Sequence, residues 1–458
     1  MESASFMKII IVGCGEAGQT LAGQLNGEGN DITVIDRDAD KVRDVALRYD
    51  IKGIVGNGAT IATLRDADIH GADLLIAVTG SDEMNLLCCI IAKKESNCRT
   101  IARLENPDYS SETSYLKDEL GLAMIINPDY AVAKEIARLL RFPTAISIDT
   151  FAKGRVELLK FKIPEDCMLV NLSVKEAVSK FNLDLLFCTV EREDGVYIVN
   201  GDFVFSGKDI ISFVATPRSA QDFFKKIKYT THAVKSAIIV GAGKTTKYLC
   251  EILGRSDISL KIIEKDRAVC EELCSQFEGV TVINADPTDK DALVEEGVAS
   301  ADAFIALSKQ DEENILLSLS AKNLSNAKLI TSIDRPDYED LVRQLGLDST
   351  IYPKNITSNM ITRYVRATKN TRGSNMQTLY NIIKDKVEAS EFIIKEPSLV
   401  VGVPLSKLKI KENILICAIL RDKAVIIPRG QDTIQVGDAV VVVSAKTMLN
   451  DITDILKK

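Results

Sequence analysis

The sequence contains no tryptophan, only two histidines, and few aromatic residues of any kind, at 5% of 458 residues. His70 and His232 stand far apart among charged or loop-forming residues, so we expect both at the surface and find few candidates for histidine acid–base catalysis. No stretch approaches about 18 uninterrupted apolar residues, and residues Met1 to Phe6 lack the basic and apolar regions of a signal peptide. We therefore expect a cytoplasmic protein that neither spans a membrane nor is secreted.

Patterns typical of metal sites and disulfides are also missing, although the chain has ten cysteines. No two of them have CxxC spacing. Cys270 and Cys274 are one helical turn apart, but no histidine or further cysteine close by in the sequence completes a tetrahedral metal site. Most of the cysteines have apolar neighbours, which is typical of buried thiols in a reducing compartment. We expect no bound metal.

The charge balance is acidic, with a formal net charge of −8. Nucleic acids and anionic membrane surfaces both require a basic patch, so no nucleic-acid partner is expected. The length and the 46% content of hydrophobic residues indicate two to four soluble globular domains.

A glycine-rich turn near the start of the chain organises the first domain. An apolar strand pattern from Lys8 leads into Gly13-Cys14-Gly15-Glu16-Ala17-Gly18, then a helical pattern, then a second strand that ends at Asp36. This is the order of a dinucleotide-binding βαβ unit, in which the three glycines permit a tight turn, close approach of the backbone to a phosphate, and packing of helix on strand. The acid would accept hydrogen bonds from ribose hydroxyls. The structural alternative is a tight turn without a ligand.

Further polar or small residues follow the later strands of this half, and the carboxyl ends of parallel strands face ligands. Their alternatives are turn chemistry, helix capping or solvated surface, and for Arg103 a structural carboxylate in place of phosphate. Glu16 faces the phosphates in such loops, so both a magnesium-bridged triphosphate and an NAD pyrophosphate remain open. The additional candidates are Arg37, Asn57, Thr60, Thr79, Gly80, Asp82, Asn85 and Arg103.

The same pattern then occurs a second time. Gly241 lies 228 residues after Gly13, and Glu264 lies 228 residues after Asp36. In the second half Thr246 replaces the third glycine and Ser332 stands where the first half has Arg103, so we expect weaker phosphate binding there. Gly437 aligns with Gly207 at an offset of 230 near the end of each half. The second-half candidates are Gly241, Gly243, Glu264, Asp286 and Ser308.

This repetition predicts an α/β chain of two tandem Rossmann-like parallel-sheet domains, each followed by a small α+β domain. Apolar stripes through Val132, Ile136 and Leu139, and through Ile356, Met360 and Tyr364, predict a helix that leaves each Rossmann-like domain and packs on a neighbouring unit or in the core. Linkers are expected near 142–150, 225–235 and 369–378. The expected segments are a first Rossmann-like domain at 7–125, an exit helix at 126–145, a small domain at 146–228, a second Rossmann-like domain at 235–350, an exit helix at 351–370 and a second small domain at 378–458.

Several ordered motifs resemble the TrkA family, the RCK-type subunits of Trk potassium uptake systems. They are GCGEAG with VIDRD, GNGAT, VTGSDEMN and IARLENPDY in the first half, and IIEKD, ADPTD, ALSKQDEENIL and SIDRPDY in the second. The resemblance implies two RCK units, each a Rossmann domain with an RCK C-terminal domain, that bind NAD(H), ATP or ADP. It also implies a homo-oligomeric ring, such as a tetramer, held at the inner face of the membrane by a TrkH-type potassium channel subunit.

Two other functions are compatible with a repeated nucleotide fold. An NAD-dependent oxidoreductase normally needs a positioned acid or base, and no such constellation follows either glycine motif. A nucleotide sensor for a different transporter would carry the same motifs. We therefore expect a regulatory subunit that is not an enzyme.

Overall fold

The computed structural model describes residues 6–109, 112–151, 154–192, 194–229, 233–347, 349–370, 376–383, 386–422, 424–445, 449 and 451–457. The chain forms two compact units. The first unit combines Met1–Ala137 with Lys235–Thr362, and the second combines Arg138–Val234 with Arg363–Lys458. His232 and parts of the expected linkers at 225–235 and 369–378 lie outside the described residues.

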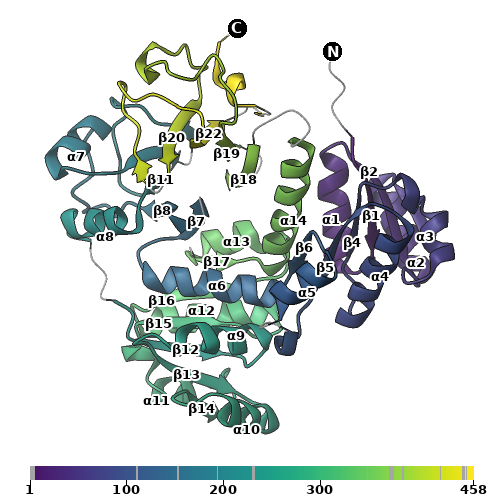
Figure 1. Ribbon diagram of the computed structural model, residues 1–458. Helices are drawn as coiled ribbons and strands as arrows, with labels where there is room; N and C mark the ends of the chain where they lie inside the picture. Colours follow the sequence, from purple (N-terminus) through teal and green to yellow (C-terminus); the bar gives the residue numbers. More distant parts are fainter. Residues whose placement is uncertain are drawn as a thin grey trace. The chain divides into compact units, whose positions relative to one another are not determined.

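The first half of the first unit is a parallel six-stranded sheet with the order β3-β2-β1-β4-β5-β6, as expected for a dinucleotide-binding fold (Figure 1). The central strands are almost wholly apolar and buried because helices cover both faces of the sheet. The strands are β1 (Lys8–Val12), β2 (Asp31–Asp36), β3 (Lys52–Val55), β4 (Leu74–Ala77), β5 (Arg99–Arg103) and β6 (Met124–Ile126). The helices are α1 (Glu16–Gly27), α2 (Ala39–Tyr49), α3 (Ile61–Asp66), α4 (Asp82–Glu95) and α5 (Thr113–Glu119).

The second half of this unit repeats the same topology, with the order β14-β13-β12-β15-β16-β17. All its strand pairs are parallel, which confirms the predicted tandem Rossmann-like folds. The strands are β12 (Ser236–Val240), β13 (Ser259–Glu264), β14 (Thr281–Asn284), β15 (Ala303–Ala306), β16 (Lys328–Ser332) and β17 (Thr350–Ile351). The helices are α9 (Lys244–Leu253), α10 (Arg267–Gln276), α11 (Lys290–Glu295), α12 (Asp311–Leu324) and α13 (Glu339–Gln344).

Each half continues into a helix that begins with proline, α6 (Pro128–Arg141) and α14 (Pro353–Asn370). Proline suits the first helical turn because that turn has no use for its missing N–H. The predicted apolar stripe of α6 is buried, but the stripe predicted for α14 is only partly buried. The buried face of α14 instead carries Thr357, Ile361 and Val365. The helical period was therefore right for α14, while the buried face lies one residue further along.

The second unit contains two antiparallel five-stranded sheets, with the orders β10-β9-β11-β8-β7 and β18-β19-β22-β20-β21. The first sheet consists of β7 (Ser147–Phe151), β8 (Val156–Lys162), β9 (Leu186–Arg192), β10 (Gly195–Ile198) and β11 (Ile210–Ala215), with helices α7 (Val174–Phe181) and α8 (Pro217–Lys226). The second consists of β18 (Met376–Ile383), β19 (Val387–Ile393), β20 (Ile414–Arg421), β21 (Ala424–Ile426) and β22 (Ala439–Ala445). In chain order the strands of the two sheets correspond one to one.

An ion pair between arginine and a buried aspartate recurs in both small domains and fixes their correspondence. Arg192 contacts Asp209 through two hydrogen bonds of 2.6 and 2.9 Å, and Arg421 contacts Asp438 through two of 2.9 Å. Each residue of the second pair lies 229 positions after its counterpart in the first pair. Gly437 (φ +95°) therefore corresponds to Lys208 (φ +70°), and its predicted alignment with Gly207 was wrong by one residue. The shared feature is a left-handed turn, which the sequence marks with glycine in one copy only.

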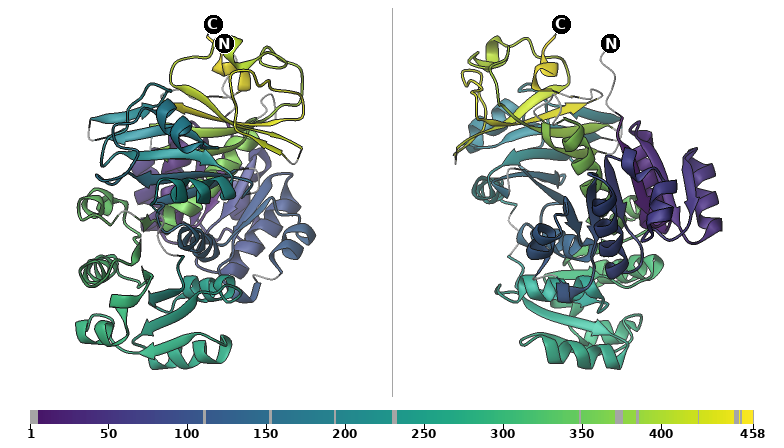
Figure 2. Two further views of the ribbon diagram at one scale, coloured as in Figure 1. Left: turned by 90° about the vertical axis from the view of Figure 1, so that its left-hand side faces the viewer. Right: turned by 45° about the vertical axis from the view of Figure 1, so that its right-hand side comes forward.

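A pair of cysteines joins the cores of the two small domains. The sulfur atoms of Cys188 in β9 and Cys417 in β20 are 3.4 Å apart, and both side chains are fully buried. They belong to an apolar cluster that includes side chains from both sheets, such as Leu158 and Val443. In the left view of Figure 2 the teal strands of the first small domain and the yellow strands of the second lie side by side.

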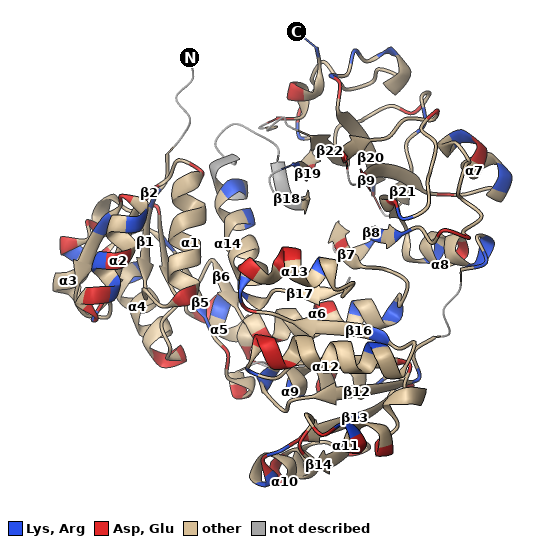
Figure 3. Ribbon diagram, turned by 180° about the vertical axis from the view of Figure 1, so that it is seen from behind, with Lys and Arg blue, Asp and Glu red and all other residues tan. Residues whose placement is uncertain are grey.

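Charged positions of both signs occur throughout the part of the chain that the structure describes. Figure 3 shows acidic and basic positions interspersed along the helices and strands. Among the helices that the structure describes, none combines the length and apolarity needed to cross a bilayer.

Candidate functional site

The first glycine loop forms an open helix N-terminus. Gly15 is the N-cap residue of α1, and as a glycine it makes no side-chain hydrogen bond to the N–H groups of the first turn. A Cβ atom on Gly15 would meet no atom within 4 Å, whereas a Cβ on Gly13, whose φ is +110°, would lie 2.9 Å from the carbonyl oxygen of Val78. The loop is therefore tight on its inner side and open where Gly15 and the free N–H groups lie. This arrangement suits an anion such as a phosphate.

Asp36 lies beside this opening at the end of β2. Its Oδ2 accepts a hydrogen bond of 2.6 Å from the backbone N–H of Cys14, and its Oδ1 accepts one of 3.0 Å from Asp38. Glu264 makes the same two contacts in the second half, with the N–H of Ala242 at 3.0 Å and that of Asp266 at 2.9 Å. Both acids thus stand at the edge of a glycine loop, where a ribose could share their oxygens. Arg37, the neighbour of Asp36, is exposed.

The two loops differ at the third glycine position. A Cβ on Gly18 would lie only 1.8 Å from the carbonyl oxygen of Gly13. Thr246 carries a Cβ at this position, is fully buried, and donates a hydrogen bond of 2.6 Å to the carbonyl of Gly241. Because such a close Cβ contact is impossible, helix and loop cannot have the same spacing in both halves. Gly243 itself is open, like Gly15.

Asn57 and Thr60 form the turn after β3. Asn57 accepts a hydrogen bond of 3.1 Å from the N–H of Ala59, and the Thr60 hydroxyl donates to the carbonyl of Asn57 at 2.9 Å. A Cβ on Gly58 between them would lie 2.3 Å from the side chain of Val12. These contacts match the turn chemistry considered as their alternative, and they place both residues at the carboxyl edge of the sheet.

Asn85 and Asp82 connect the ends of β4 and β5. Asn85 is fully buried and bonds the N–H of Thr79 at 2.7 Å and the carbonyl of Arg103 at 2.9 Å. Asp82 accepts hydrogen bonds from the N–H groups of Glu105 and Asn106 at 2.9 and 2.8 Å. These side chains hold the carboxyl ends of β4 and β5 together through contacts with backbone groups, whereas Gly80 is exposed in the loop after β4.

The second half contains the same connection. Asn314 bonds the N–H of Ser308 at 2.8 Å and the carbonyl of Ser332 at 2.9 Å. Asp286, by contrast, is exposed and accepts hydrogen bonds from its own turn, from the N–H and the hydroxyl of Thr288. Because these bonds favour the ionised carboxylate, they lower the pKa of Asp286.

Arg103 ends β5 and contacts a carboxylate. Its guanidinium forms an ion pair with Glu105, and Glu105 also contacts Lys244 of the second half at 3.1 Å. Burial opposes ionisation of Glu105, but Arg103 and Lys244 together hold its pKa below the usual range. The Nε of Arg103 is buried and has no hydrogen-bond partner among the described residues. The structure thus supports the carboxylate alternative for Arg103 while one donor remains available.

The N-terminus of α6 contacts the glycine loop of the second half. Asp129 accepts a hydrogen bond of 2.6 Å from the hydroxyl of Thr245, and Asn127 donates one of 2.8 Å to the hydroxyl of Tyr248. The rings of Tyr130 and Tyr248 pack edge to face at 5.5 Å. Burial raises the pKa of Asp129, although Thr245 and Lys244 act in the opposite direction. A carboxylate of the first half therefore lies at the helix N-terminus of the second glycine loop.

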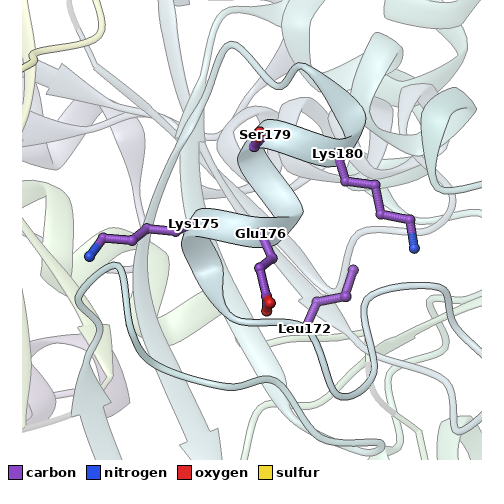
Figure 4. Close-up of a pocket in the computed structure, with 5 residues that line it drawn as sticks. All are labelled: Leu172, Lys175, Glu176, Ser179 and Lys180. Carbon is purple, nitrogen blue, oxygen red and sulfur yellow. The ribbon is translucent and has the colours of Figure 1, made fainter.

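Of two surface hollows, one lies away from these loops, and the other borders Glu264, whose carbonyl accepts hydrogen bonds from the lining residues Cys270 and Asn284. The first, of about 540 Å³ on α7, is lined by Leu172, Lys175, Glu176, Ser179 and Lys180. Figure 4 shows Lys175 and Lys180 pointing to opposite sides, and Glu176 bonds Ser173 in a capping box, so no polar groups converge there. The other, of about 580 Å³, is lined by Arg267, Cys270, Glu271, Cys274, Ser275 and Asn284. No group of three or more potential metal ligands occurs among the described residues.

Sequence reasoning missed four residues that connect the two halves: Glu105 contacts Lys244, Asp129 contacts Thr245, and Lys354 forms an ion pair with Glu16. One signal was available in the repeat, because Lys244 stands where the first half has Glu16, and Lys354 follows Pro353 as Asp129 follows Pro128. Both positions reverse charge between the halves. A contact between the halves was not evident from either motif alone.

Comparison with protein families assigns both parallel-sheet domains. The TrkA-N domain model matches residues 9–128 and 237–353, and the TrkA-C domain model matches residues 389–457. The first small domain has the strand order of the second, although the TrkA-C model matches only the second. The family models thus agree with the repeat read from the sequence.

Solved structures share the fold. The GsuK channel aligns with a TM-score of 0.65 at 14% identity, covering 97% of this chain and 78% of that one. The GsuK RCK domain aligns with a TM-score of 0.63 at 15% identity, covering 97% and 94%. A structure of the GsuK channel bound to NAD aligns with a TM-score of 0.64 at 14% identity, covering 97% and 78%.

Curated relatives match over the full length. Trk system potassium uptake protein TrkA homolog 1 of Methanosarcina mazei is 34% identical and covers 98% of this chain and 100% of its own length. Trk system potassium uptake protein TrkA of Halomonas elongata is 31% identical and covers 95% of each chain. Both relatives are named as potassium uptake proteins. With its repeated TrkA-N domains and full-length matches, the chain belongs to the TrkA family of Trk system potassium uptake proteins.

Proposed function

We propose that this chain binds an adenine nucleotide, either NAD(H) or ATP and ADP, at its first glycine loop and thereby regulates a TrkH-type potassium channel subunit from the cytoplasmic side. The observation that carries the proposal is the uncapped helix N-terminus behind Gly15, with the Asp36 carboxylate beside it. The loop offers N–H donors to phosphate and Asp36 offers an acceptor to ribose. The free Nε of Arg103 adds a further buried donor at the same edge of the sheet.

Proteins of the same fold support the ligand class. One aligned structure is described as the GsuK channel bound to NAD, and another as GsuK bound to ADP, the latter with a TM-score of 0.50. Both ligands contain adenosine and a pyrophosphate. Our proposal extends this ligand class to the present chain on the basis of its own glycine loop and acid.

The first half is the better binding site. Its loop keeps Gly18 and its β5 ends in Arg103, whereas the second half has Thr246 and Ser332. The second loop also has the Asp129 carboxylate within 2.6 Å of Thr245, and a negative charge there opposes an incoming phosphate. We therefore assign the tight site to the first half and weak binding to the second.

The exit helices provide the path from ligand to small domains. Both α6 and α14 begin in the first compact unit and end in the second. If these helices can adopt two arrangements, a ligand that binds one arrangement more tightly than the other increases the population of the tighter-binding arrangement. Ligand binding at the strand ends is thereby expected to bias the placement of the small domains.

We also propose that the chain assembles as a homo-oligomeric ring, such as a tetramer. Leu87 on α4 and Leu316 on α12 occupy equivalent positions and are 44% and 65% exposed. Exposed apolar side chains at the same place on both halves favour a surface that packs against further copies. Light scattering should show a species larger than one chain, and Leu87→Asp with Leu316→Asp should reduce its size. A monomer under all nucleotide conditions would contradict the ring.

Two glycine variants test the binding proposal. Gly15 has φ −66°, and a Cβ there meets no atom, so Gly15→Ala should fold while placing a methyl group where phosphate approaches. Gly243→Ala makes the same change in the second loop. We expect calorimetry with ATP, ADP, NAD and NADH to show at least about a tenfold loss for Gly15→Ala and little change for Gly243→Ala. The opposite ranking would move the site to the second half, and no binding of any nucleotide to the unmodified chain would refute the proposal.

Regulation requires a separate measurement. The chain should be reconstituted with its membrane subunit, and ion flux should be followed while each nucleotide is added. We expect at least one nucleotide to change the flux and Gly15→Ala to reduce this response. Flux that ignores all four nucleotides would exclude regulation by them, and sustained turnover of NADH with an acceptor would instead favour an oxidoreductase.

A further inference from the structure

Each exit helix begins at the glycine loop of the other half. The ammonium group of Lys354, the second residue of α14, is 2.6 Å from the Glu16 carboxylate of the first loop. Figure 1 shows α14 beside α1, and α6 beside α9 of the second half. Lys354 thus brings a residue of the second half to the mouth of the first nucleotide site.

The charges of the corresponding loop and helix residues are reversed between the two halves. In the first loop the loop residue is acidic, Glu16, and the helix residue is basic, Lys354. In the second loop the loop residue is basic, Lys244, and the helix residue is acidic, Asp129. The helix contributed by the other half therefore adds positive charge to the first loop and negative charge to the second.

The surroundings of Lys354 hold its charged end close to the loop. Its side chain is 20% exposed, whereas that of Glu16 is 76% exposed. The Asp334 carboxyl group also lies within electrostatic range of both Lys354 and Glu16. The lysine is therefore confined near two acids, while Glu16 is free to turn into solvent when a stronger anion takes its place.

We infer that Lys354 is a specificity-determining residue of the first site, which exchanges Glu16 for the terminal phosphates of a bound nucleotide. The inference rests on the proposed function and adds a second-half residue to it. Without Lys354, the opening would present the acids Glu16 and Asp36 to an incoming anion. With Lys354 present, a triphosphate gains a charge-assisted contact to the lysine ammonium group. The same contact contributes less to binding of NAD, whose pyrophosphate is shorter and carries less negative charge.

The exchange also connects the ligand to an exit helix. Lys354 lies in the first turn of α14, and this helix continues into the second compact unit. A nucleotide whose phosphates reach Lys354 contacts the first turn of α14. A ligand whose phosphates do not reach Lys354 leaves the ion pair between Lys354 and Glu16 intact. The site can therefore distinguish ligands by the reach of their phosphates.

The test compares ATP, ADP and NAD binding to the full chain by calorimetry at low ionic strength. We expect Lys354→Gln to weaken ATP about tenfold or more and NAD no more than about threefold, because a charge-assisted contact is lost mainly from the triphosphate. Lys354→Arg keeps the charge and should retain the preference. Lys290→Gln removes the same charge from an exposed position on α11 and should change none of the affinities.

A double-mutant cycle completes the test. Glu16→Gln removes the competing partner and should tighten ATP binding in the presence of Lys354 but much less in Lys354→Gln. Equal effects of Lys354→Gln on ATP, ADP and NAD, or effects equal to those of Lys290→Gln, would overturn the inference while leaving nucleotide binding intact. If the unmodified chain bound none of the three nucleotides, both the inference and the proposed function would be refuted.

Discussion

The carboxylate of Asp36 and the backbone N–H of Cys14 are joined by a hydrogen bond of 2.6 Å, so the acid that ends β2 is attached to the loop that ends β1. A ribose bound at this acid would share a group that already shapes the phosphate loop. Loop geometry and ribose binding therefore depend on one side chain.

Asp36→Ala should remove both contributions. We expect the nucleotide affinity of the tight site to fall by at least about tenfold, since a hydrogen bond to a charged group contributes about 1.5 to 3 kcal/mol. Calorimetry should show this loss, together with little effect of Glu264→Ala on the tight site. If Glu264→Ala removed the tight site and Asp36→Ala did not, the two halves would have exchanged roles.

Gly18→Ala should be more damaging to folding than Gly15→Ala. The added Cβ would lie 1.8 Å from a backbone oxygen at Gly18 but meets nothing at Gly15. Overpacking of this kind typically costs about 1 to 3 kcal/mol and more where backbone must move, so we expect a clear fall in the thermal midpoint for Gly18→Ala only. Similar midpoints for the two variants would show that the loop is looser than described.

The repeated ion pairs of the small domains should contribute equally to stability. Asp209 and Asp438 are each 1% exposed in side chain and each accept two bonds from arginine, with a further bond from Ser206 or Gln435. The arginines are about one-third exposed, which moderates the effect. Asp209→Asn and Asp438→Asn should each cost about 2 kcal/mol, measured as a shift in the unfolding of the second unit. A large effect of one and none of the other would contradict the equivalence of the two turns.

Thiol reactivity should distinguish one cysteine from the rest. Cys274 is exposed and the other nine cysteines are buried. Burial raises the pKa of Cys14 to about 12 and those of Cys88 and Cys250 to about 11, so their reactive thiolates are scarce at about pH 8. A disulfide reagent should label one thiol rapidly in the folded chain and ten after denaturation. The rapid phase should vanish in Cys274→Ser, and several rapid thiols would contradict the burial pattern.

Asp129 should make the first unit less stable as the pH rises. Burial raises its pKa in the folded state, so the folded chain binds a proton that the unfolded chain releases. Its unfavourable ionisation is absent below the usual aspartate pKa and develops as the pH rises from that value through the higher pKa of the folded state. Asp129→Asn should flatten the dependence of the thermal midpoint on pH in this range. Superimposable profiles for the two proteins would show that this carboxyl group is not responsible.

The parallel-sheet domains could be predicted because their signals are local. A buried strand, a glycine turn and an amphipathic helix follow one another within each unit, and the acid at Asp36 marks the end of the second strand. The small domains were less predictable. Strand β7 lies in the stretch expected to be a linker near 142–150, and the short helix α7 depends on its Ser173 and Glu176 capping box. Such short elements are stabilised by strand pairing and helix caps, and they are too short to show a clear repeating pattern of apolar residues in the sequence.

The placement of the candidate site residues in the fold was predictable to the same extent. The glycines and the two acids could be found because their spacing is set within a single βαβ unit. Lys354 and Asp129 could not be assigned, because they reach their loops by packing of one half on the other. Asn85 and Asp82 were recognised as lying near the crevice, but only the structure shows that they bind backbone groups there.

Cys188 and Cys417 occupy the same position in the two repeats and touch each other, as one residue does across the two-fold axis of a symmetric dimer. In such a dimer every substitution appears at both ends of the contact, so neither copy can change alone. A tandem chain removes this restriction and keeps the partners at a high effective concentration. Each loop can then mutate independently, which is how one can keep Gly18 while the other has Thr246. The duplicated architecture therefore allows one copy to specialise while its partner serves as scaffold.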